Sequence, residues 1–96
     1  MTLAEVMRSI DAFGDDATLF VRRPWTPTSE CVVEVDDDPE LPRRLKSKGL
    51  EYFLETFVIR EVLEVFQGKP PSDEEKLRLV IHYAENDAYP DWVYAR

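Results

Sequence analysis

The sequence predicts an α+β fold, in which a small, mainly antiparallel sheet of two to three strands packs with three main helices. Apolar residues recur at helical spacing in three segments, and two of these segments begin with a capping box. Two runs of β-forming residues, 17–23 and 31–35, are joined by a connection too long for a two-residue hairpin and too short for a crossover helix. The expected order is α-β-β-(short α)-β-α-α in a single domain, residues 1–96, with 90–96 as a C-terminal aromatic tail.

The first helix is expected over residues 3–13. Thr2 and Glu5 form a capping box, in which Thr2 is the N-cap and Glu5 reaches back to the Thr2 amide. One apolar face then follows at helical spacing: Leu3, Val6, Met7, Ile10 and Phe13. Gly14 is expected to end this helix.

The strands are expected in three runs. Residues 17–23 predict the first strand, which Pro24 ends because proline cannot donate to a strand ladder. Residues 31–35 predict a second strand, antiparallel to the first. The proline-containing acidic stretch 36–42 is expected as a loop, and 41–48 as a helical turn that ends at Gly49. Residues 50–55 predict a third strand, although their leucines and glutamates leave a helix open.

Two further helices complete the expected fold. Thr56 is the candidate N-cap of a helix over 57–67, which carries an apolar stripe and is broken by the segment 68–71. A second capping box, formed by Ser72 and Glu75, begins a helix over 73–86.

Acidic residues exceed basic residues by 20 to 12, which gives a net charge of −8. The resulting field repels nucleic acid and anionic membranes and attracts basic protein surfaces. No apolar run has the length of a membrane span, and the first residues lack the profile of a signal peptide. A single cysteine, Cys31, cannot form an internal disulfide. A cytoplasmic protein is therefore expected, with no direct nucleic-acid partner and no membrane partner.

Motifs for catalysis are missing, so no enzyme activity, catalytic residue or cofactor is expected. His82 is the single histidine and has no nucleophile three or four residues away, and Cys31 is expected to be a buried structural thiol. The glycines are isolated, so they form no phosphate-binding loop. The run Asp36, Asp37 and Asp38 lacks the EF-hand pattern, so no metal site is expected. It predicts either a solvated acidic loop or a surface that meets a basic partner.

Two kinds of side chain are candidates for partner binding. The acidic candidates, which would steer a basic partner, are Asp15, Asp16, Asp36, Asp37, Asp38 and Glu40. The aromatic candidates are Trp25, Trp92 and Tyr94, because Trp and Tyr bury a large area on binding at low entropic cost. The alternative is that both tryptophans fold back onto the domain. The one basic stretch, with Arg43, Arg44, Lys46 and Lys48, is expected as a solvated face.

Three short motifs carry a resemblance to a known family. They are Pro24-Trp25-Thr26 followed by Cys31-Val32-Val33, then Gly49-Leu50-Glu51-Tyr52, then Tyr83-Ala84-Glu85-Asn86-Asp87-Ala88-Tyr89. Together they resemble a family of small acidic bacterial proteins associated with the immunity proteins of toxin systems. The resemblance implies that Asn86 and Asp87 are polar residues of the binding site. From the residues alone, the same pair is expected to close a helix.

Three functions stay open at this point. The first is an immunity protein or antitoxin that covers a basic toxin surface, and the second is a phage-encoded anti-CRISPR or other anti-defence inhibitor that mimics nucleic acid. The third is a small enzyme or ligand-binding domain that uses His82, Cys31 or the acids. In the first two functions the partner is a basic protein, either a toxin or nucleic-acid-processing machinery. The oligomeric state is not predicted.

Overall fold

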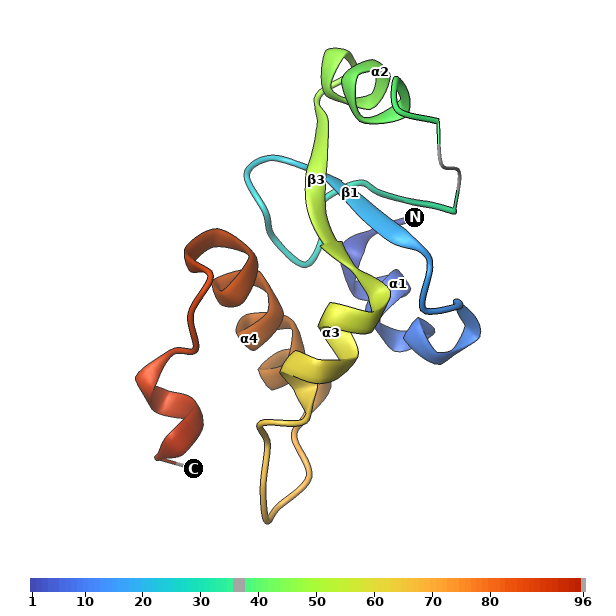
Figure 1. Cartoon of the computed structure of the whole chain (residues 1–96). Helices are drawn as coiled ribbons and strands as arrows, with labels where there is room; N and C mark the ends of the chain where they lie inside the picture. The colour runs from blue at the N-terminus through green and yellow to red at the C-terminus, as the bar shows by residue number, and fades with distance from the viewer. Residues whose placement is uncertain (36–37, 96) are drawn as a thin grey trace.

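The computed structural model describes residues 1–35 and 38–95, and it confirms the predicted α+β fold and element order (Figure 1). The helices are α1 (Leu3–Arg8), α2 (Leu41–Ser47), α3 (Thr56–Leu63) and α4 (Asp73–Asn86), with two short 3-10 helices, η1 (Ile10–Ala12) and η2 (Asp91–Tyr94). The strands are β1 (Thr18–Arg22), β2 (Cys31–Glu34) and β3 (Leu50–Glu55). The run 50–55, for which a helix was left open, is thus a strand.

The sheet has the order β2-β1-β3, and both strand pairs are antiparallel. Leu19 lies opposite Leu54 and Phe20 opposite Tyr52, so the β1–β3 register shifts between Leu19 and Phe20. Phe53 is the extra residue of this bulge, and the consecutive Phe53 and Leu54 therefore both belong to the main apolar cluster.

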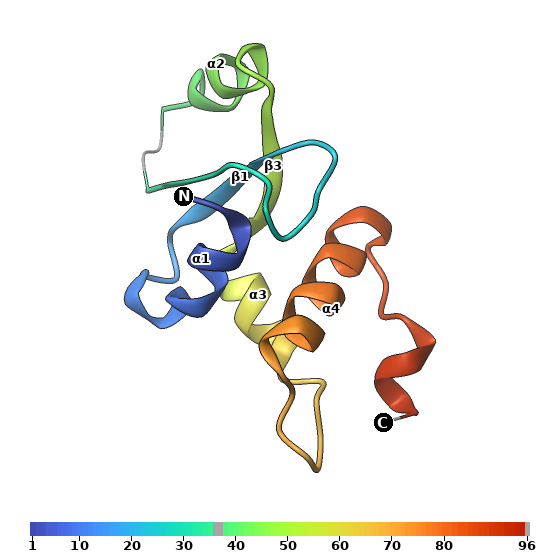
Figure 2. The ribbon, with the colours of Figure 1, turned by 180° about the vertical axis from the view of Figure 1, so that it is seen from behind.

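The main core lies where the sheet meets α1, α3 and α4. Its fully buried members include Leu3, Leu19, Phe53, Ile59 and Leu79, each from a different helix or strand. In the view from behind, α1 lies near α4, and the two helices are in contact (Figure 2). A smaller cluster under α2 is formed by Phe20, Leu45 and Leu50.

The first helix is shorter than predicted. The capping box of Thr2 and Glu5 is present, but α1 ends at Arg8 and a 3-10 turn follows from Ile10. The Ser9 hydroxyl donates to the Glu5 carbonyl, 3.0 Å away, a local bond that competes with the continuing helix. Gly14 lies beyond the extended Phe13, so it does not cap the helix as expected.

The prediction that Thr56 caps α3 is wrong. Thr56 is the first residue of the helix and is fully buried, and its N-cap is Glu55. The Thr56 hydroxyl donates to the carbonyls of Gly14 and Ala17, which ties α3 to the turn before β1. The helix also ends at Leu63, four residues earlier than the predicted 67.

The last helix agrees with its prediction. The capping box of Ser72 and Glu75 begins α4, and Asp87 closes it in the left-handed conformation with φ +52°. The tail then folds back along the helix, where η2 buries Val93 (Figure 1). Across residues 1–35 and 38–95, none of the helices has the length and apolar character needed to cross a bilayer.

Candidate functional site

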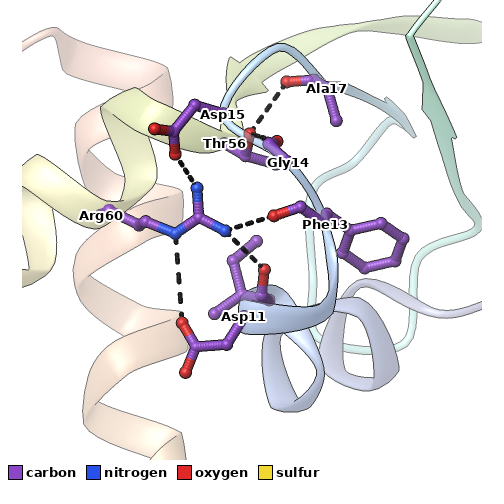
Figure 3. A network of polar contacts seen from close by, with 8 residues as sticks. Asp11, Phe13, Gly14, Asp15, Ala17, Thr56 and Arg60 are labelled. Carbon is purple, nitrogen blue, oxygen red and sulfur yellow. Dashed lines mark hydrogen bonds and ion pairs between the residues drawn. The ribbon is translucent and has the colours of Figure 1, made fainter.

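Asp15 has a structural partner in the folded chain. Its carboxylate accepts a hydrogen bond from the Arg60 guanidinium, which also donates to the carbonyls of Ile10 (3.0 Å) and Phe13 (Figure 3). The α3 arginine therefore holds the turn between η1 and β1. Asp16, the neighbouring candidate, is exposed.

Asp38 and Glu40 also have local partners. The Asp38 carboxylate accepts from the Glu40 amide at 2.9 Å and from the Arg44 guanidinium at 2.8 Å, so it organises the start of α2. Glu40 pairs with Arg43 at 3.4 Å. The basic stretch thus offsets part of the acidic loop. The other two candidates of this loop, Asp36 and Asp37, lie outside the described residues.

Trp25 is a core residue, which corrects the expectation that it offers an accessible ring. It is 8% exposed, and its indole N–H donates to the Val21 carbonyl at 3.1 Å. Its ring meets Phe53 edge to face with centroids 5.0 Å apart, and the Arg23 guanidinium lies 3.8 Å from the ring centroid. Of the two alternatives for Trp25, the structure shows the one in which the side chain folds back onto the domain.

The C-terminal candidates differ in accessibility. Trp92 is half-buried. The ring centroids of Phe66 and Trp92 are 6.2 Å apart, and the Arg78 guanidinium lies 4.5 Å from the centroid of the Trp92 ring. Tyr94 is 69% exposed. Asn86 and Asp87 are exposed, and the Asn86 side chain donates to the His82 carbonyl at 2.9 Å.

The two residues considered for catalysis, Cys31 and His82, lie on β2 and α4. Cys31 is 3% exposed, and burial raises the pKa of its thiol to about 12. A thiol with this pKa is not a nucleophile at neutral pH. His82 is half-buried on α4. Within the described part of the chain, no group of three or more His, Cys, Asp or Glu residues is placed to hold a metal ion.

A groove of about 620 Å³ runs along α4 beside the β1–β2 loop. Its apolar lining comes from Pro27, Leu77 and Ile81, and its polar lining from Glu74, Arg78, His82, Glu85 and Asn86. Asn86, which the resemblance selected, therefore lies at this groove. Since acids, a base and apolar groups are mixed here, the groove has no single chemical preference.

A second surface gathers the exposed aromatic side chains. Tyr52, Phe57, Tyr89 and Tyr94 are 49%, 42%, 37% and 69% exposed, and Tyr83 contacts Tyr89 with ring centroids 5.4 Å apart. Three glutamates lie among them. We name this surface the tyrosine–glutamate band, and its members are Tyr52, Glu55, Phe57, Glu61, Glu64, Tyr83, Tyr89 and Tyr94.

Electrostatic contacts connect the members of the band. Burial raises the pKa of Tyr89, and Tyr83, Tyr94, Glu61 and Glu64 raise it further, in that order. The pKa of Tyr52 is also raised, to about 12. Burial is the largest cause, the hydrogen bond to Glu55 (3.0 Å) comes next, and Tyr83 adds a smaller effect. Tyr83 therefore links the strand end of the band to the C-terminal end.

Negative charge is concentrated in the same half of the molecule. Residues 61–95 contain eight acids and three bases, and residues 1–60 contain twelve acids and eight bases. In the first sixty residues, five arginines pair with six acids: Asp11, Asp15, Glu30, Asp38, Glu40 and Glu51. The acids exposed beyond residue 60 are Glu61, Glu64, Asp73, Glu74, Glu85, Asp87 and Asp91. Exposed acids thus outnumber basic residues over α3, α4 and the tail.

Sequence reasoning found only Tyr94 among the members of the band. The others lie on β3, α3, α4 and the tail, and their proximity is a product of the tertiary fold. One signal was available: Phe57, Glu61 and Glu64 share a stripe of α3 that lies outside the predicted apolar stripe. A large aromatic residue on the polar face of a helix points to a binding surface.

Comparison with known proteins gives one match. A family model with the description "Domain of unknown function (DUF7716)" matches residues 1–92, which include every helix and strand except the end of η2. No curated protein and no solved structure matches the chain. The family description names no function, so the resemblance to immunity proteins stays a prediction.

Proposed function

This chain belongs to the DUF7716 family, and we propose that it is a small acidic binding protein that docks on a basic protein partner. The observation that carries the proposal is the tyrosine–glutamate band. It combines exposed aromatic rings with three carboxylates. Tyrosine is enriched among the residues that dominate binding energy, and uncompensated acids raise the rate of association with a basic surface.

Within this class, we propose an immunity protein or antitoxin that acts in the cytoplasm. Such a protein needs a preformed surface and no reactive group. The inaccessible Cys31 thiol and the lack of a metal-binding group among the described residues support a binding role over an enzymatic one. The resemblance of three short motifs to immunity proteins supports the same class.

The alternative is an anti-defence inhibitor that mimics nucleic acid. A mimic of phosphate charge needs carboxylates in rows, because phosphates repeat along a backbone. In the band, aromatic rings accompany the carboxylates, and this composition favours a protein surface with both apolar and basic groups. A partner that is a nucleic-acid-processing enzyme, bound in its nucleic-acid channel, would support the alternative.

The proposal is tested by capture of partners with three tagged forms of the protein at low and high salt. The forms are the wild type, the band variant E61Q/E64Q and the control variant E30Q/E51Q, which removes the same number of charges from acids that pair with Arg22 and Arg23. We expect the wild type and the control to capture the same basic protein at low salt, and the band variant to capture much less. Equal capture by all three forms at both salt concentrations would contradict the proposal.

A further inference from the structure

We infer that Tyr89, backed by Tyr83 and flanked by Glu61 and Glu64, is the seat for one arginine side chain of the basic partner. The inference rests on the proposed function and specifies which chemical group of the partner this surface receives. The two rings come from α4 and from the segment that follows it, and the two acids come from α3 and its C-cap.

The two rings form a fixed platform. Their centroids are 5.4 Å apart and their planes are inclined by 51°. Tyr83 is half-buried on α4, whereas Tyr89 follows the helix and is 37% exposed. The left-handed Asp87 turns the chain immediately before Tyr89, so the backbone holds that ring against its neighbour. A preformed ring surface lowers the entropic cost of binding.

The carboxylates near this platform keep their negative charge available. Glu61 and Glu64 are exposed on one stripe of α3, and both act on the Tyr89 hydroxyl. Arg60 is the basic residue of this helix, and its guanidinium points to the carbonyls of Ile10 and Phe13 and to Asp15 (Figure 3). It is therefore directed to the η1–β1 turn and not to the seat.

An arginine fits the seat better than a lysine does. A guanidinium is planar, stacks on an aromatic face and can donate two parallel hydrogen bonds to a carboxylate at the same time. The chain shows the same stacking inside its own fold, where Arg23 lies 3.8 Å from the Trp25 ring centroid and Arg78 lies 4.5 Å from that of Trp92. At the seat, this chain supplies the ring and the acids, and the partner supplies the arginine.

The test is a titration of the 15N-labelled protein with three capped tripeptides, followed by amide chemical shifts. The probes are acetyl-Gly-Arg-Gly-amide, the same peptide with lysine, and the same peptide with citrulline, the neutral analogue of arginine. We expect saturable shifts at Glu61, Glu64, Tyr83 and Tyr89 with the arginine peptide. Binding of the lysine peptide is expected to be several-fold weaker, and the citrulline peptide is expected to cause no saturable shift.

Matched variants assign the effect to the ring and to the acids. Tyr89→Leu and E61Q/E64Q are each expected to weaken arginine binding about five-fold or more, the effect of losing one cation–π contact or its charge partners. Tyr89→Phe keeps the ring and is expected to bind as the wild type does. E30Q/E51Q, which removes the same number of charges from acids that pair with Arg22 and Arg23 outside the band, serves as the control and is expected to change nothing.

Two results would overturn the inference. One is equal shifts with the arginine and lysine peptides, spread over the exposed acids of α4. The other is unchanged arginine binding in Tyr89→Leu. Both would leave the proposed function standing, because it requires only that the acidic half binds a basic protein. The proposed function can also fail while the inference holds. If the arginine peptide binds saturably at the seat but the wild type, E61Q/E64Q and E30Q/E51Q capture partners equally, the proposed function is wrong and the inference about the seat stands.

Discussion

Replacing Arg60 with methionine is expected to destabilise the fold by about 3 kcal/mol. The substitution keeps the apolar stem and removes the guanidinium that donates to the carbonyls of Ile10 and Phe13. A hydrogen bond from a charged donor contributes about 1.5–3 kcal/mol, and the lower end applies because the Arg60 side chain is 29% exposed. The ion pairs to Asp11 and Asp15 add less than about 1 kcal/mol in total, since those carboxylates are 98% and 76% exposed.

The assay is equilibrium unfolding in urea, followed by circular dichroism, with two companion variants. Arg60→Lys keeps the charge but not the planar fork, so it is expected to recover only part of the loss. Asp15→Asn is expected to cost less than about 1 kcal/mol and to leave partner capture unchanged, because Asp15 acts within the fold. An Arg60→Met protein within about 0.5 kcal/mol of the wild type would refute the reasoning, since exposed ion pairs alone account for a loss of that size.

Three further predictions concern a glycine, the thiol and a tyrosine. Gly49→Ala is expected to lose about 1–2 kcal/mol in the same unfolding assay, because Gly49 has φ +85° and a Cβ there would lie 2.3 Å from the Arg22 guanidinium; an unchanged midpoint would contradict this. Cys31 is expected to resist alkylation at pH 8 in the native protein and to react fully in urea, because burial raises its pKa to about 12; fast native labelling would contradict this. Tyr52, whose pKa is raised to about 12, is expected to give an ionisation step near pH 12 in an absorbance titration. The raised pKa stabilises the fold fully below about pH 10, and this contribution is lost as the pH rises toward 12; a titration curve unaltered by Tyr52→Phe would contradict the assignment.

Local signals predicted much of the fold. Both capping boxes are present at Thr2 and Ser72, and the strands begin and end within one residue of the predicted runs. These features depend on side chains within a few residues of one another, so the sequence contains them directly.

The errors occur where a distant segment competes with a local preference. Thr56 has a side chain suited to an N-cap, yet its hydroxyl bonds to carbonyls about forty residues earlier in the chain. Trp25 lies in a proline-rich loop, a sequence that predicts exposure. Its burial depends on contact with Phe53 in β3. Neither contact has a sequence pattern, because each forms only when the sheet and the helices pack.

The candidate site proposed from the structure lies elsewhere than most of the residues expected from the sequence. The three consecutive aspartates drew attention to the loop before α2, where Arg44 pairs with Asp38 and Arg43 pairs with Glu40. The tyrosine–glutamate band draws its residues from β3, α3, α4 and the tail. These segments are brought together by tertiary packing, which the order of residues along the chain does not reveal.

The measurement that tests the central claim most directly is the association rate with the captured partner, as a function of salt, for the wild type, E61Q/E64Q and E30Q/E51Q. We expect the wild type and E30Q/E51Q to associate fast at low salt and to slow steeply as salt is added. The band variant E61Q/E64Q is expected to associate more slowly and to depend less on salt. Identical rates and identical salt dependence for all three proteins would contradict a role of the band in binding.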